Sequence, residues 1–218
     1  MIGLIIRDEL IFRTCSICSS TWGNTLEFYS IKVLNGLFTT PFTKKLTTDS
    51  SIIVETEPTD TLVLEALKPS KRLFLLCAGI GVASFISTIF DPETYIRYDE
   101  IIVVLACRCS QKLQYFNNKI KQMTKELHIN LYAKNKLRFY LNTTQELYPY
   151  IGRITWLVKP GTIIADLMTY NFDKMNGFMI YGSQQMVLDV TGLLKSLGCT
   201  ERAINGPQDF RYGKTYVS

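Results

Sequence analysis

An uncharged run of 18 residues, 73–90, constrains the fold of this chain more than any other feature. Its length reaches the lower limit for a helix that crosses a bilayer, but Gly79-Ile80-Gly81 divides it into two halves. The first half, 73–77, is a short apolar run typical of a strand buried on both faces. The second half, 82–90, has apolar residues at helical spacing. Because Gly, Ser and Thr dilute the run and no basic cluster flanks one end only, we predict a strand, a turn and a helix, and no membrane span.

The composition indicates a well-packed globular protein and gives no sign of nucleic-acid binding. The 218 residues suffice for one large or two small domains, 47% of them are hydrophobic, and 20% are charged. The net charge of +5 is mild and fits an acidic protein partner or an anionic cofactor. No RNA-binding or zinc-finger pattern occurs, so we predict no nucleic-acid partner.

The N-terminus and the cysteines indicate a reducing compartment. The apolar start, MIGLII, is short and meets the charged Arg7 at once, so it is not a signal peptide, and we predict a cytoplasmic location. The six cysteines are then free thiols. Cys15 and Cys18 have the spacing of a metal pair, but no second such pair follows and His128 is the only histidine. We therefore predict no metal site.

The pattern of the chain changes near residue 70. Before it, alternation at 27–33 and a β-branched segment at 51–55 predict short strands separated by turns, as in a small barrel. After it, apolar strands alternate with helices, which predicts a doubly wound parallel sheet. The expected strands are 73–77, 100–105, 136–140 and 177–181, and the expected helices are 82–90, 111–127 and 184–197. We place the domain boundary so that the domains are 1–69 and 70–218.

Polar residues and glycines follow three of the predicted strands. They occupy residues 79–81, 108–110 and 182–186. Ligands of doubly wound sheets bind outside the carboxyl ends of the strands. We therefore expect these segments to meet on one edge of the sheet and to form a nucleotide site.

A set of motifs in a fixed order extends this pattern over nearly the whole chain. They are Arg13-Thr14-Cys15-Ser16, EFYSIKVLNG at 27–36 with Thr39-Thr40 after it, PTDTLVLEALKPSKRLFLL at 58–76, GIGVASF at 79–85, DPETY at 91–95, GRIT at 152–155, YGSQQM at 181–186 and DFRYGKTYVS at the C-terminus. In this order they resemble the bacterial subclass of the ferredoxin–NADP reductase family, which has Arg-x-Tyr-Ser, GTGLAPF and CGSPxM at the corresponding places.

The resemblance implies a two-domain α+β and α/β protein. An antiparallel flavin-binding β-barrel would be followed by a doubly wound NAD(P)-binding domain. The implied activity transfers hydride between NADPH and FAD, and single electrons between FAD and ferredoxin or flavodoxin. Lysines of the predicted helix 111–127 would form a solvated face or a docking face for an acidic carrier; they are Lys112, Lys119, Lys121 and Lys125.

The resemblance also assigns roles to individual residues. Ser16 and Tyr181 would be catalytic. Those implied for FAD are Arg13, Cys15, Ser16, Lys32, Gly36, Thr39, Thr40, Thr61 and Tyr216. Those implied for NADP(H) are Gly79, Gly81, Val82, Arg108, Thr144, Arg153, Gly182, Ser183 and Met186. A cation and a glycine turn suit the flavin diphosphate, Tyr216 would cover the flavin ring, and arginines suit the phosphates of NADP(H).

Departures from the family pattern modify these expectations. The chain begins where the family has an inner strand of the flavin domain, so we expect an incomplete barrel. Cys15 replaces a flavin-stacking tyrosine, Tyr181 replaces a cysteine beside the nicotinamide, and Gln145 replaces an arginine for the 2′-phosphate. Weaker flavin binding, crowding of hydride transfer and a relaxed preference for NADPH would follow. Three further departures are Asp60 for glycine, Ser84 for proline and Gly213 for glutamate.

Two other functions are compatible with the same fold. One is a non-catalytic remnant that acts as an interaction module without flavin. The other is an NAD(P)-binding module that works without flavin. Retention of FAD distinguishes the reductase from both, and nucleotide binding without flavin would identify the second.

Overall fold

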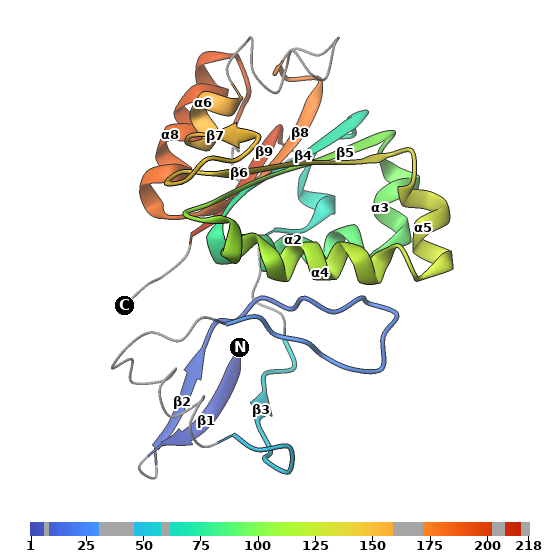
Figure 1. Cartoon of the computed structure of the whole chain (residues 1–218), viewed down its shortest axis with the longest axis vertical. Coiled ribbons are helices and arrows are strands. Elements are labelled where there is room, and N and C mark those ends of the chain that lie inside the picture. The colour runs from blue at the N-terminus through green and yellow to red at the C-terminus, as the bar shows by residue number, and fades with distance from the viewer. Residues whose placement is uncertain (7–8, 31–45, 58–61, 159–171, 202–207, 215–218) are drawn as a thin grey trace.

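A computed structural model describes residues 1–6, 9–30, 46–57, 62–158, 172–201 and 208–214, which form two sheets (Figure 1). The N-terminal sheet is antiparallel, with strand order β2-β1-β3. Its strands are β1 (Ile2–Ile6), β2 (Glu9–Arg13) and β3 (Ile53–Val54). Ile2 is the buried centre of this small sheet. An antiparallel sheet in this half agrees with the barrel-type domain expected from the sequence.

The second sheet is parallel and contains six strands in the order β7-β6-β5-β4-β8-β9. The strands are β4 (Arg72–Ala78), β5 (Glu100–Cys107), β6 (Leu137–Thr143), β7 (Tyr150–Ile151), β8 (Asn176–Gly182) and β9 (Phe210–Lys214). After β4 the chain adds β5, β6 and β7 on one side and then returns to add β8 and β9 on the other. This reversal confirms the doubly wound topology.

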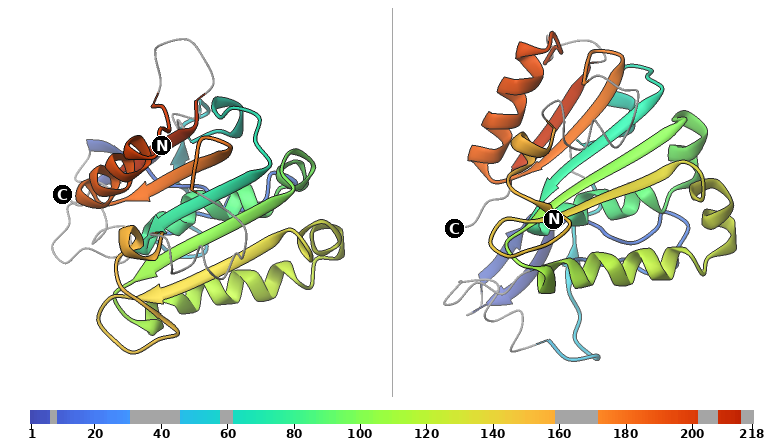
Figure 2. Two further views of the ribbon diagram at one scale, coloured as in Figure 1. Left: turned by 90° about the horizontal axis from the view of Figure 1, so that it is seen from above. Right: turned by 45° about the horizontal axis from the view of Figure 1, so that its top comes forward.

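Helices cover both faces of the parallel sheet (Figure 2). On one face lie α2 (Ala83–Ile89), α3 (Pro92–Arg97), α4 (Gln114–Met123) and α5 (Leu127–Ala133). On the other lie α6 (Ile154–Leu157) and α8 (Gln184–Ser196). Leu73 and Leu75 of β4 point into the first core, and Phe74 and Leu76 point into the second. Because every residue of such a strand meets a core, the strand is a continuous apolar run.

Two predicted elements are wrong in extent. The helix expected over 111–127 begins as a 3-10 turn at Ser110–Leu113, ends at Met123, and is followed by the separate helix α5. The backbone of Glu126 is extended, and this residue separates the two helices. Of the strand expected over 27–33, residues 27–30 contain only an isolated bridge, between Phe28 and Ile17; residues 31–33 lie outside the described part.

Residues outside the N-terminal sheet join the two parts of the molecule through a shared core. Cys18 from the N-terminal part, and Leu62 and Leu67 from the connecting segment, are buried in the same core as α2 and α4. A 3-10 turn at Leu64–Ala66 lies within that connecting segment. In the part of the chain that the structure describes, no helix is both long enough and apolar enough to cross a bilayer.

Asp209 makes the stability of the parallel sheet depend on pH. It is 2% exposed and accepts hydrogen bonds from the Thr200 amide (2.7 Å), the Thr200 hydroxyl (2.6 Å) and the Lys68 ammonium group (3.2 Å). Burial by itself raises the pKa of the Asp209 carboxyl, but the bonds from Thr200 and Lys68 outweigh burial and lower this pKa.

Because the pKa of Asp209 is depressed in the folded state, its stabilising effect is present above the unfolded pKa of about 3.9 and is lost as the pH falls through the folded value. We expect Asp209→Asn to lower the free energy of unfolding by about 1–2 kcal/mol at pH 7. When urea unfolding is measured from pH 7 to pH 3, the free energies of unfolding of the unsubstituted protein and of Asp209→Asn should converge as the pH falls. A difference that is constant with pH would contradict this account.

Candidate functional site

The reversal of the sheet places the carboxyl ends of β4 and β8 side by side. Cys77 of β4 is in register with Tyr181 of β8. A 3-10 turn at Gly79–Val82 follows β4 and leads into α2. Ser183 follows β8 and caps α8, where its hydroxyl accepts a hydrogen bond from the amide of Met186 (3.3 Å). Such a reversal point is where doubly wound sheets bind ligands.

A cavity of about 680 Å³ opens at this edge. Seven of the nine residues predicted to bind NADP(H) line it: Gly79, Val82, Arg108, Thr144, Arg153, Ser183 and Met186. They come from the ends of β4, β5, β6 and β8 and from the start of α6. The expectation that these segments meet on one edge is thus confirmed, although binding by these residues stays a prediction.

The charge of the cavity suits an anionic ligand. Arg108, Lys112 and Arg153 bring three cationic side chains to its lining, and Asp189 brings one carboxylate. Guanidinium groups bind phosphate through paired hydrogen bonds. Lys112 was predicted on the face of a helix, but it lies in the 3-10 turn at Ser110–Leu113, directly after β5, and lines the cavity.

The two glycines of the 79–81 segment have different structural reasons. Gly79 has a φ of 55°, a conformation that residues with a side chain seldom adopt, and apart from its chain neighbours no atom of the described residues lies within 4 Å of a Cβ placed there. Gly81 is buried, and a Cβ placed on it would lie 2.4 Å from the carbonyl oxygen of Tyr181. Gly81 therefore allows the turn to lie directly against β8.

Two further predicted residues lie beside the cavity; Gly182 is buried and Tyr181 is half-buried. Gly182 is covered by the side chain of Met186, whose sulfur would lie 2.2 Å from a Cβ at residue 182. Tyr181, predicted to be catalytic, is half-buried and packs on the core that contains α2. Neither Tyr181 nor Gly182 is one of the described residues that line the cavity.

Ser16 connects the N-terminal part to the nucleotide side. Its hydroxyl lies 2.7 Å from the hydroxyl of Ser84, the second residue of α2, in a hydrogen bond. Ser84 is buried, and it is the residue that replaces a proline of the family pattern. The predicted catalytic hydroxyl is therefore held next to the turn after β4, within the same edge of the sheet.

The remaining residues predicted for FAD are only partly placed. Arg13 is exposed at the end of β2, and its Nη1 donates a hydrogen bond to the carbonyl oxygen of Phe12 (2.8 Å). Cys15 is half-buried and packs on the small core around Ile2. Lys32, Gly36, Thr39, Thr40, Thr61 and Tyr216 lie outside the described residues.

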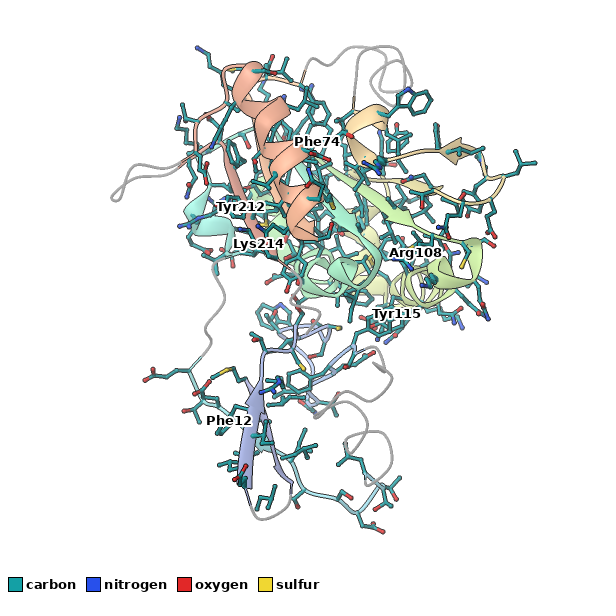
Figure 3. All side chains as sticks on the ribbon, turned by 90° about the vertical axis from the view of Figure 1, so that its left-hand side faces the viewer. Phe12, Phe74, Arg108, Tyr115, Tyr212 and Lys214 are labelled. Carbon is teal, nitrogen blue, oxygen red and sulfur yellow. The ribbon has the colours of Figure 1, made fainter. Side chains whose placement is uncertain are left out.

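Aromatic and charged side chains join the N-terminal part to α4. The rings of Tyr29 and Tyr115 stack with centroids 3.9 Å apart and an interplanar angle of 8°. Glu27 accepts a hydrogen bond from the Tyr115 hydroxyl (3.3 Å) and forms an ion pair with Lys119. Figure 3 shows Tyr115 where the two parts of the molecule meet. Both tyrosines also line the cavity, so the cavity is bounded by both halves of the chain.

Burial makes the thiols near the site unreactive. Desolvation of Cys107, which lines the cavity and is 4% exposed, raises its thiol pKa to about 11. Cys77 is fully buried, and desolvation raises its pKa well above 9. The thiolate is the nucleophile in alkylation, so both thiols are inert near neutral pH.

We therefore expect Cys107 and Cys77 to resist iodoacetamide in the native protein at pH 7.5 and to react after unfolding. Peptide mass spectrometry of the alkylated protein measures this directly. Fast native labelling of Cys107 at pH 7.5 would show that the cavity wall is more open than the structure indicates.

Comparison with known proteins identifies relatives over the whole chain. No protein-family model matches it. It is 36% identical to a flavodoxin/ferredoxin–NADP reductase of Rhodobacter capsulatus, covering all of this chain and 81% of that protein. It is 35% identical to a ferredoxin–NADP reductase of Pseudomonas aeruginosa, again over the whole chain and over 84% of the relative.

The fold has close counterparts among solved structures. A ferredoxin NADP+ reductase from Neisseria gonorrhoeae with bound FAD and NADP superposes with a TM-score of 0.86 at 24% identity, covering 99% of this chain and 84% of that one. A flavohemoglobin from Malassezia yamatoensis superposes with a TM-score of 0.69 at 20% identity, covering 98% and 49%. The sequence identity of 35–36% to these reductases over the whole chain, together with this fold, shows that the chain belongs to the ferredoxin–NADP reductase family.

Proposed function

We propose that this protein is a flavin-dependent ferredoxin (or flavodoxin)–NADP+ reductase. It transfers hydride between NADPH and FAD, and single electrons between FAD and an iron–sulfur or flavin carrier. The observation that carries this proposal is the cationic cavity at the reversal point of the sheet, bounded on its other side by the N-terminal part. Family membership and the place of seven predicted nucleotide residues in that cavity support it.

The nucleotide side of the site has groups for a dinucleotide diphosphate and an added phosphate. Arg108 and Arg153 offer guanidinium groups, and Lys112 adds an ammonium group at the same cavity. The backbone at Gly79 is open to close approach, because no atom occupies the space that a Cβ would fill. We assign phosphate binding to these four residues.

The flavin side of the site offers hydrogen-bond donors of the kind that FAD requires. Arg13 offers an exposed cation for the diphosphate, and Ser16 offers a hydroxyl that Ser84 holds at the edge of the nucleotide domain. When bound, FAD supplies the chemistry that passes electrons from a two-electron donor to a one-electron acceptor, or in the reverse direction. Ser16 would hydrogen-bond near its reactive ring, and the shared core would keep the two halves together.

The finer parts of the proposal concern location and organisation. We propose that residues 1–69 carry the flavin and 70–218 the nicotinamide nucleotide, that the protein acts in the cytoplasm, and that its carrier is acidic. Of the four lysines considered for docking, Lys119 pairs with Glu27 and Lys112 lines the cavity. Lys121 and Lys125 stay exposed, so they are the docking candidates. No observation on the described residues favours the non-catalytic alternatives.

Anaerobic stopped-flow mixing tests the proposed activity. The FAD-loaded protein should lose its flavin absorbance on mixing with NADPH and should then reduce a ferredoxin or a flavodoxin. If the protein binds NADP+ but holds no FAD that NADPH can reduce, the nucleotide-module alternative is established instead. A protein that binds neither ligand would establish the interaction-module alternative.

A further inference from the structure

The ring of Tyr181 lies in a space that two glycines leave open. On one side, a Cβ placed on Gly81 would lie 3.0 Å from Cδ1 of the ring. On the other side, a Cβ placed on Gly213 would lie 2.6 Å from both Cδ2 and Cε2. The distance from Gly81 is tighter than most real Cβ contacts, and the distance from Gly213 is one that real Cβ atoms essentially never show. The ring therefore contacts the backbone of both glycines directly.

The position of Gly213 in the sheet explains this contact. Gly213 lies in β9 and is in register with Tyr181 in β8, so the two residues are cross-strand neighbours on one face. Leu62 lies beside the same space, since its Cδ1 would be 3.2 Å from the Cβ at residue 213. The buried core that contains Leu62 and Cys77 closes this side.

A side chain at residue 213 would leave the ring one direction to move. Gly81 and the core of Leu62 close two sides, and β9 itself would close the third. Tyr181 is the second-last residue of β8, next to the carboxyl edge of the sheet, and its side chain is half-buried. That edge carries Gly79 and Ser183 of the nucleotide cavity.

We propose that Gly213 is a positioning residue that holds the Tyr181 ring against β9 and thereby keeps the nicotinamide end of the site clear. This inference rests on the proposed reductase function. The crowding expected from tyrosine in place of a small residue is relieved by the glycine at 213. Tyr181 and Gly213 form a matched pair, because the tyrosine ring fits only where residue 213 has no side chain.

A double-substitution series tests this pair. The proteins are the unsubstituted chain, Gly213→Ala, Tyr181→Ala and the double variant, each loaded with FAD. In Gly213→Ala, we expect flavin reduction at saturating NADPH to slow by roughly 10- to 100-fold, as for a displaced reacting group. NADP+ affinity should change little, because Arg108 and Arg153 bind the other end. In the Tyr181→Ala background, Gly213→Ala should cause no further slowing.

Thermal unfolding provides a second readout that does not depend on activity. Gly213→Ala should lower the unfolding midpoint of the unsubstituted chain, but it should leave that of Tyr181→Ala unchanged or raised. Gly192→Ala is the matched control, because outside the backbone of its own helix no atom of the described residues lies within 4 Å of a Cβ at that residue. It should raise the midpoint slightly and leave flavin reduction unchanged.

The possible failures are distinguishable. If the unsubstituted protein retains FAD but NADPH does not reduce it, the proposed function itself fails. If NADPH reduces the unsubstituted protein and Gly213→Ala equally fast, the reductase stands and the positioning role is overturned. Equal effects of Gly213→Ala in both backgrounds, on rate or on the unfolding midpoint, would overturn the contact as well.

Discussion

Gly81→Ala is expected to lower the free energy of unfolding by about 2–3 kcal/mol, the upper part of the range for overpacking a close-packed interior. The added Cβ would lie 2.4 Å from the carbonyl oxygen and 3.0 Å from the carbonyl carbon of Tyr181. These are backbone atoms of a central strand, so they cannot move aside as a flexible side chain does. The turn at Gly79–Val82 must separate from β8 instead, which opens the proposed nucleotide site. NADP+ affinity should fall together with stability, and urea unfolding and calorimetric titration measure the two quantities.

Two other glycines serve as controls for this result. Gly192→Ala, in the middle of α8 with open space around it, should raise the free energy of unfolding by roughly 0.5–1 kcal/mol. Gly79→Ala should lower the free energy of unfolding by about 1–2 kcal/mol, because a φ of 55° is unfavourable for alanine. The open space around this residue means that no steric clash adds to this cost. If Gly81→Ala behaved like Gly192→Ala, the close approach of the turn to β8 would be refuted.

Arg153→Ala is expected to raise the KM for NADPH by roughly 10- to 100-fold, as for loss of a hydrogen bond to a charged group. Arg153 is exposed at the start of α6 and lines the cavity with Arg108 and Lys112. Gln145 stands where the family pattern has an arginine for the 2′-phosphate, so we propose that Arg153 takes most of that task. The KM for NADH, which lacks this phosphate, should change little. Steady-state diaphorase assays with both nucleotides measure the difference.

Conservative and remote substitutions control for general effects of charge. Arg153→Lys should give an intermediate KM for NADPH, because it keeps the charge and loses the paired hydrogen bonds. Lys121→Ala removes an exposed cation from α4, away from the cavity, and should leave both KM values unchanged. Equal increases for NADPH and NADH in Arg153→Ala would show that Arg153 does not read the 2′-phosphate.

The central strands were predictable because burial on both faces leaves a plain mark in the sequence. β4 and β5 are surrounded by core and read as continuous apolar runs. The helix α8 was predictable from its periodicity and from Gly198, which follows it with a φ of 82°. The short helix α3 was missed despite its signal, Asp91-Pro92, where the Asp91 side chain caps the amide of Glu93.

The contacts between segments distant in the sequence were not predictable from local patterns. The Tyr29–Tyr115 stack and the Ser16–Ser84 hydrogen bond join residues more than 60 positions apart, and no periodicity reveals such pairs. Likewise, no local pattern indicated that Gly213 lies beside the ring of Tyr181. The cavity was predicted better, because the seven predicted residues that line it all follow strand ends of one parallel sheet.

The most direct test of the central claim is the visible absorption spectrum of the purified protein after incubation with excess FAD and desalting. We predict retained flavin bands that bleach anaerobically on addition of NADPH. A folded protein that emerges colourless from the desalting step would contradict the reductase function.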